Sequence, residues 1–253
     1  MRKVTQSRLV RLATAVQRRA SSDDLGTHAA ALTYQAFLSI LPLALLALTI
    51  LGALLRGHDR ADWLDRIDEA VPGLDAVLGR PVGLGFVAAA ALLWTGSAVA
   101  RRATHALATV FRTDPRGTVV KRLRGLLDVV VLATMFGGAL ALTGIAPDAV
   151  ALRLVSFVAI ATAELGFFLA AYRLLTPGGP AFRAHLPGAL FATVGWQVLK
   201  LAGGLLVVKT AARATALYGT VGSVIGIFVF LSLASKLFLY GAELSATLAE
   251  ERA

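Results

Sequence analysis

The chain has 253 residues, of which 57% are hydrophobic and only 16% are charged, and its mean hydropathy is +0.73. A soluble domain carries about 25% charged residues, so this composition excludes an ordinary soluble enzyme and indicates a surface that faces lipid. The absence of cysteine excludes a disulfide framework, a thiolate metal site and a cysteine nucleophile. The net charge of +10 leaves two interpretations, nucleic-acid binding and orientation in a membrane.

Six apolar segments follow one another along the chain, and each reaches the length of about 20 residues that a helix needs to cross a bilayer. They are predicted at about residues 29–55, 81–100, 126–146, 152–172, 186–208 and 217–249. Pro42 lies inside the first span and predicts a helix kink there. The second span is predicted to end at Arg101 and Arg102. The sequence therefore predicts an all-α polytopic membrane protein, a six-transmembrane-helix bundle that forms a single membrane domain over residues 1–253.

Two shorter segments have the spacing of amphipathic helices. Residues 1–28 carry apolar and basic side chains on different helical faces and predict a basic amphipathic segment on the cytoplasmic surface; the apolar face holds Leu9, Leu12 and Val16, and the basic side chains are Arg8, Arg11, Arg18 and Arg19. Between the first two spans, a second helical spacing fits either a short interfacial helix or a solvated connector; its members are Trp63, Ile67, Val71 and Leu74.

The basic residues are distributed unequally across the predicted membrane. Six Lys and Arg precede the first span and seven follow the second, and on this topology one side holds sixteen against seven on the other. The positive-inside rule then places both termini in the cytoplasm. No basic stretch is interleaved with stacking aromatics, so we expect no nucleic-acid partner and instead expect anionic lipid headgroups at the cytoplasmic face.

Five ionisable residues fall inside the predicted spans, where charges are costly and therefore mark candidate functional sites: Asp128, Glu164, Lys200, Lys236 and Glu243. For Asp128 and Glu243, near the span ends, the alternative is that the side chain snorkels to the interface. Glu164 lies close to the middle of its span, which favours a buried or cavity-facing position.

Polar and small residues share one face of the sixth span, within an arc of about 140°. This face holds Gly219, Gly222, Gly226, Ser232, Lys236, Tyr240, Glu243 and Thr247. Gly222 and Gly226 have the GxxxG spacing of close helix packing. In the fifth span Gln197 shares a face with Lys200, and we expect these two faces to meet inside the bundle. A cavity for an anion or amphiphile and a static packing network both fit this pattern.

Several short segments, in their order, resemble the YihY/BrkB family of bacterial inner-membrane proteins, once mislabelled ribonuclease BN. They are residues 30–34 (AALTY), 39–42 (SILP), 93–97 (LWTGS), 186–189 (LPGA), 218–219 (YG) and 241–244 (GAEL). The resemblance implies six helices with cytoplasmic termini in a bacterial cytoplasmic membrane, and a role in transport of lipid or envelope precursors.

The hypothesis favoured by these observations is a non-enzymatic membrane protein that transports or binds a lipid, anionic or envelope component through a polar intramembrane face. The alternative is a structural or regulatory protein that assembles with itself or with an envelope protein through helix packing. The four histidines are scattered, so the sequence supports neither a metal site nor ribonuclease activity. No catalytic constellation and no phosphate-binding loop is recognised, and we expect no cofactor.

Overall fold

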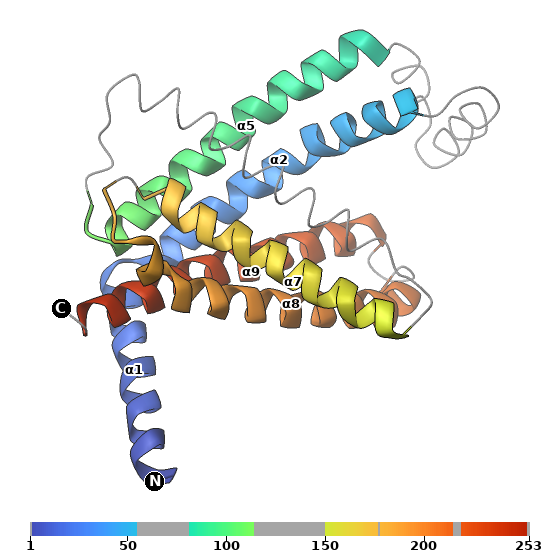
Figure 1. Cartoon of the computed structure of the whole chain (residues 1–253). Coiled ribbons are helices and arrows are strands. Elements are labelled where there is room, and N and C mark those ends of the chain that lie inside the picture. The colour runs from blue at the N-terminus through green and yellow to red at the C-terminus, as the bar shows by residue number, and fades with distance from the viewer. Residues whose placement is uncertain (1, 55–80, 114–149, 177, 215–218, 252–253) are drawn as a thin grey trace. The chain divides into compact units, whose positions relative to one another are not determined.

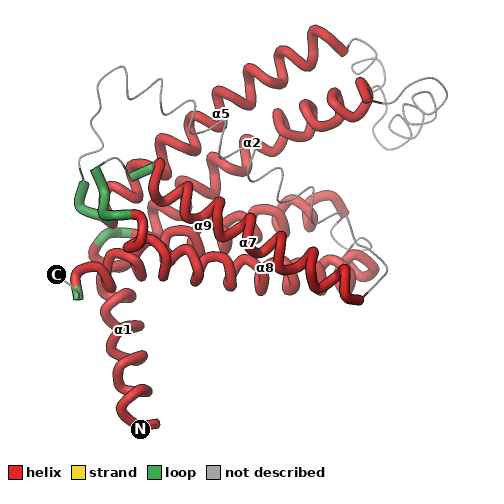
Figure 2. Tube along the Cα trace, viewed as in Figure 1, coloured by secondary structure: helices red, strands yellow, loops and turns green. Residues whose placement is uncertain are grey.

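The computed structural model describes residues 2–54, 81–113, 150–176, 178–214 and 219–251. Every regular element in these ranges is a helix, as Figures 1 and 2 show. The helices are α1 (Arg2–Ser22), α2 (Leu25–Leu54), α5 (Pro81–Val110), α7 (Val150–Leu174), the 3₁₀ helix η1 (Phe182–His185), α8 (Leu186–Ala214) and α9 (Gly219–Glu250). The all-helical prediction is confirmed for these ranges. The predicted third span, with Asp128, and the segment around Trp63 lie outside them.

Three helices of the described part are long and apolar enough to cross a membrane. These stretches are Leu25–Leu45, Val155–Leu174 and Val224–Glu250. They correspond to the predicted first, fourth and sixth spans. The bundle of six spans stays a prediction.

The helix ends differ from the predicted span ends, most clearly in α5. Helix α5 does not stop at Arg101 and Arg102 but continues to Val110. It continues because buried apolar residues recur at helical spacing beyond the charged pair, at Ala103, Ala106, Leu107 and Val110. Helix α2 runs through Pro42 as one element, and a bend at this residue stays a prediction.

The chain divides into two compact units. One comprises Met1–Thr33 and Ala100–Ala253, and the other comprises Tyr34–Val99. The second unit contains the greater parts of α2 and α5, whose side chains include strongly exposed Leu41, Phe86 and Trp94. Exposed apolar side chains of this size suit contact with lipid. The prediction of a single membrane domain is not tested by this division.

Close packing of α8 against α9 organises the first unit, in which α8 also contacts α7 (Figure 1). Gly188 lies against Gly241 at one end of this contact, and Gly203 lies against Phe230 toward the other, so the two helices are antiparallel. A Cβ atom on Gly188 would overlap the Gly241 backbone. Glycine is therefore required where the two backbones meet.

Buried hydrogen bonds join the helices around this glycine contact. The Tyr172 hydroxyl donates to the Phe238 carbonyl at 2.7 Å. Ser245 Oγ accepts from the Gly188 N–H at 2.9 Å and donates to the His185 carbonyl at 3.2 Å. The Phe238 carbonyl thus provides an acceptor for the buried Tyr172 hydroxyl, and Ser245 provides one for the Gly188 N–H in the first turn of α8.

The glycine packing predicted for α9 is only partly described. At Gly226 an added Cβ would meet no described atom within 4 Å, so close packing at this residue stays a prediction. Gly219 and Gly222 lie in the first turns of α9, and their packing falls outside the described part. The polar face that contains Lys236 and Gly226 also does not meet α8. Instead α9 contacts α8 through residues such as Phe230, Leu237 and Gly241, because side chains there fit against the α8 glycines.

The face of α8 that points away from α9 and α7 is apolar. Its exposed residues recur at helical spacing and are Leu190, Phe191, Val194, Val198 and Leu201. A row of this kind in water would be an aggregation surface, whereas in a bilayer it is an ordinary lipid-facing surface. This face therefore supports the membrane assignment.

Substituting Gly188 or Gly241 by alanine should lower stability by about 1–3 kcal/mol, because the new methyl group forces the α8 and α9 backbones apart. The matched control is Gly226→Ala, where the space is open and alanine favours the helix by about 1 kcal/mol. Thermal unfolding in detergent micelles measures both. Equal unfolding temperatures for Gly188→Ala and Gly226→Ala would contradict the packing described here.

Candidate functional site

The first candidate site is an ion pair between α7 and α8. Lys200 Nζ lies 2.6 Å from Glu164 Oε1. The Glu164 side chain is 4% exposed and the Lys200 side chain 22%. The carboxylate is thus enclosed by the helices, whereas the ammonium keeps some access to the surroundings.

The positions of these two residues follow from the antiparallel course of α7 and α8. Glu164 lies about 15 Å along the axis from Leu174, at about 1.5 Å per residue, and Lys200 lies about 21 Å from Leu186. Both charges are therefore deep within apolar helices. A charge at this depth must be paired, and each residue supplies the partner that the other needs.

The pair has unused hydrogen-bonding capacity. Glu164 Oε2 is buried and has no donor among the described residues, and Gln197 Nε2, one turn before Lys200 on α8, is buried without an acceptor. The Lys200 ammonium carries three N–H groups, of which one points to Glu164. The site can therefore bind a further polar group without giving up its ion pair.

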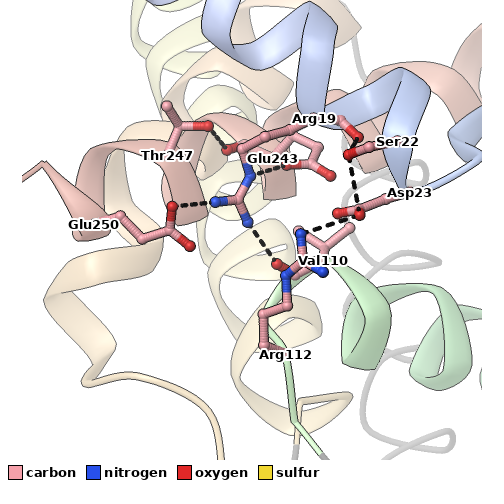
Figure 3. A network of polar contacts seen from close by, with 8 residues as sticks. All are labelled: Arg19, Ser22, Asp23, Val110, Arg112, Glu243, Thr247 and Glu250. Atoms are coloured by element: carbon pink, nitrogen blue, oxygen red, sulfur yellow. Dashed lines mark hydrogen bonds and ion pairs between the residues drawn. The ribbon is translucent and has the colours of Figure 1, made fainter.

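The second site is centred on Arg19, at the end of α1 (Figure 3). Its Nε donates to Glu243 Oε2 at 3.1 Å, its Nη2 donates to the Val110 carbonyl at 3.0 Å, and its Nη1 pairs with Glu250. One guanidinium therefore connects α1, α5 and α9. Burial alone would lower the pKa of Arg19, but its hydrogen bonds to Glu250 and Glu243 outweigh burial and raise the pKa, so the group stays charged.

A neighbouring ion pair extends this site. Arg112 Nη2 lies 3.2 Å from Asp23 Oδ1, and the Ser22 hydroxyl also donates to that oxygen at 3.4 Å. Asp23 is buried, whereas Arg112 is largely exposed. Arg112 has φ 54°, and the bonds from Thr113 N to the Ala108 carbonyl and from Arg112 N to the Thr109 carbonyl close α5 around it.

An open cleft of about 390 Å³ borders the Arg19 site. It runs along the end of α5, the loop at Gly178 and the last turns of α9, and Arg112 and Glu250 both line it. The exposed ends of the network therefore reach solvent through this cleft.

The predicted site residues separate into two groups. Glu164 and Lys200 pair between α7 and α8, with Gln197 one turn before Lys200 on α8, while Tyr240 and Glu243 lie on the side of α9 that meets α1. The Tyr240 hydroxyl lies 3.2 Å from Gln17 Oε1. Lys236 is exposed and joins neither group, and Asp128 lies outside the described residues.

For Glu243, the alternative that its side chain snorkels to the interface is wrong. Its side chain is fully buried and paired with Arg19. Burial of the carboxylate is tolerated because the guanidinium is buried with it.

Sequence reasoning missed the basic partner of this site, because Arg19 was assigned to the surface charges of the N-terminal segment. Asp23 and Arg112 lie in connecting segments, where a charged residue carries no signal of a buried site. A signal was present: Glu243 and Glu250 are seven residues apart, so they share a helical face that needs a cation. The described residues contain no group of three His, Cys, Asp or Glu that could hold a metal ion.

Removing one partner of the α7–α8 pair should be costly. Lys200→Met leaves the Glu164 carboxylate buried without a cation and should lower stability by about 3–5 kcal/mol. The double variant Glu164→Gln, Lys200→Met should recover most of the loss, because no charge remains buried. Denaturant unfolding of the wild type, both single variants and the double variant measures the coupling, and strictly additive losses would contradict a direct pair.

His185 should make stability depend on pH. Burial lowers the pKa of this residue and the charge of Arg173 lowers it further, while a backbone interaction with Pro180 partly opposes both. The unfolded state, titrating at about pH 6.5, then binds more protons than the folded state in acid. The free energy of unfolding should therefore be unaffected by His185 above about pH 6.5 and should fall as the pH drops below that value.

The same measurement in a variant assigns this effect. His185→Phe should flatten the fall in unfolding temperature between about pH 7.5 and 5.5. An unchanged slope in His185→Phe would show that other groups cause the acid sensitivity.

Among comparisons with known proteins, one family model matches nearly the whole chain. The sequence model of the family described as "Virulence factor BrkB" matches residues 16–253. A protein of Bacillus subtilis (strain 168) described as "Putative ribonuclease-like protein YfkH" is 34% identical over 68 residues, which is 27% of this chain and 24% of that protein. The match therefore spans about a quarter of that relative. No solved structure matches the chain.

Proposed function

We propose that this chain, which belongs to the Virulence factor BrkB family, is a multi-pass protein of the bacterial cytoplasmic membrane that binds or transports an anionic amphiphile. The ligand would contact the Glu164–Lys200 site with its headgroup, and its acyl part would lie in the surrounding bilayer. Both termini would be cytoplasmic, as the distribution of basic residues predicts.

The observation that carries the proposal is the incomplete satisfaction of a deep ion pair. Lys200 is oriented by Glu164 yet remains partly exposed, and Gln197 Nε2 is a buried donor without an acceptor. A phosphate or carboxylate headgroup supplies acceptors for both. A purely structural ion pair would be expected to use its donors within the protein.

A structural role is the second candidate, and one observation favours it. The α9 segment from Val224 to Val229 is exposed and includes Gly226, where the space is open. Small and apolar residues on a span suit packing against a second copy or an envelope protein. An enzymatic role has less support, because the ribonuclease-like name belongs to a relative matched over a quarter of its length.

Reconstitution in liposomes tests the proposal. Movement of a labelled anionic phospholipid between leaflets should fall about 10-fold to 100-fold in Lys200→Ala, since a hydrogen bond to a charged group contributes about 1.5–3 kcal/mol. Glu164→Gln should also reduce it. The control Thr162→Ala, whose hydroxyl bonds only its own helix at the Val158 carbonyl, should move lipid at the wild-type rate.

Two outcomes count against the proposal. Absence of movement with the wild type would remove the transport role, and an unaltered rate in Lys200→Ala would remove this site. Lys236→Ala separates the sites further: a loss confined to Lys236→Ala would place the ligand on the exposed face of α9. A stable dimer in lipid without lipid movement would favour the structural role.

A further inference from the structure

The Arg19 site carries one more negative charge than positive charge. Its carboxylates are Asp23, Glu243 and Glu250, and its guanidiniums are those of Arg19 and Arg112. In a partly buried network this imbalance is unfavourable, because attraction and repulsion are both stronger than in water. One further positive charge would neutralise the site.

Two oxygens of this network lack a donor among the described residues, and they belong to neighbouring carboxylates. Asp23 Oδ2 and Glu243 Oε1 are both buried without a hydrogen-bond partner. The side chains themselves lie within hydrogen-bonding reach, and Figure 3 shows the free Glu243 oxygen directed toward Asp23. While both groups are ionised, neither oxygen can donate, so the contact is repulsive.

A proton on either carboxyl group turns this repulsion into a hydrogen bond. Two carboxylates held in contact share one proton because like charges so close cannot both ionise. A metal ion fits less well. Calcium takes six to eight oxygen ligands, and in the described residues the two guanidiniums of Arg19 and Arg112 flank the carboxylates and would repel a cation.

We propose that Asp23 and Glu243 form a proton-binding site that holds one shared proton and thereby fastens α1 to α9. Binding takes one proton from water onto a carboxylate oxygen and forms an O–H···O hydrogen bond to the other carboxylate. Release returns the proton to water and leaves two facing carboxylates. The inference does not depend on which component the protein transports.

Charged and titratable groups from each neighbouring element tune this site. Arg19 of α1 pairs with Glu243, and Arg112 after α5 pairs with Asp23. From α9, Glu250 shares Arg19, and the Tyr240 hydroxyl contacts α1 at Gln17. From the start of α2, His28 interacts electrostatically with Asp23 and with Asp24 in the preceding turn. The cleft beside Arg112 and Glu250 brings water to the edge of the network.

The site lies where proton binding can move a helix. Helix α1 contacts α9 with its C-terminal end, where Val16 and Ala20 are buried, while Val10 and Arg11 farther out are exposed. The docked state holds a proton that separated carboxylates release at neutral pH. Docking should therefore strengthen as pH falls and weaken as pH rises.

Infrared spectroscopy of the full chain in lipid tests for the proton. The C=O stretching band of a protonated carboxylic acid should be present at neutral pH and disappear at alkaline pH. It should be absent at neutral pH in both Asp23→Asn and Glu243→Gln, since each removes one member of the pair. The exposed Glu251 provides the control, and Glu251→Gln should keep the band.

A second measurement follows the position of α1 relative to α9 directly, first with Asp23 and Glu243 unchanged. The chain has no cysteine, so Val10→Cys and Glu251→Cys introduce two unique spin-label positions on α1 and beyond α9. The distance distribution should be narrow near pH 6 and broad near pH 9. With Glu243→Gln added, it should stay narrow at both values, because the amide donates to Asp23 permanently.

Three results would overturn the proposal. One is the absence of a carboxylic-acid band at neutral pH in the wild type. Another is a band that persists in both pair variants, which would place the proton elsewhere. The third is a band that appears only when sodium is withheld, which would identify a cation as the ligand. A distance distribution that does not change with pH would contradict the coupling between proton binding and the position of α1. The infrared measurement would still decide whether the shared proton exists.

Discussion

The contact between Gly188 and Gly241 determines where the charged side chains of the first unit can lie. With no side chain on either residue, α8 and α9 approach at backbone distance, and this fixes both the register and the rotation of each helix. Lys200 is then directed from α8 toward α7, where Glu164 meets it. Glu243, two residues after Gly241, is turned to the opposite side and meets Arg19. Two separate charge sites thus follow from one close approach.

The sequence was informative about which residues matter and less informative about how they pair. Glu164 and Lys200 stand out because charges in long apolar runs are rare. Their pairing required the rotation of two helices whose surfaces are apolar nearly all round. In a bilayer the buried face and the lipid face are both apolar, so hydrophobic periodicity marks neither. Gly226 and Lys236 of the predicted α9 face are accordingly exposed among the described residues, and their role stays a prediction.

Arg19 illustrates a different limit. In a tail with many basic residues, one arginine that enters the protein cannot be told from those that face lipid headgroups or solvent. Its assignment depends on Glu243 and Glu250, which lie more than 200 positions later in the chain. Helix ends were less predictable, because charged residues lie inside several helices: α7 includes Arg153 and Arg173, and α8 continues past Lys209 to Ala214. Arg101 likewise shows that a charged pair can lie inside a helix whose next turns are buried.

The Glu164–Lys200 pair and the Arg19 site also differ in their surroundings, so the two sites suit different kinds of ligand. Glu164 and Lys200 lie deep in helices with an exposed apolar face nearby, which suits a ligand with an acyl part. The Arg19 site lies beside an open cleft, with Arg112 and Glu250 at its edge. Exchange of small species with water suits that position. Family membership accounts for the membrane character of the chain, and the geometry divides its interior into these two environments.

Ser245 has a consequence for the order in which the chain is built. Its hydroxyl accepts the N–H of Gly188, a group in the first turn of α8 that has no partner within its own helix. That first turn is therefore completed by a residue of α9, which is synthesised after α8. Until α9 has emerged and docked, the start of α8 retains an unpaired backbone donor, which is unfavourable in a bilayer. The entry of α8 into its final packing should thus wait for α9, the helix that supplies the missing acceptor.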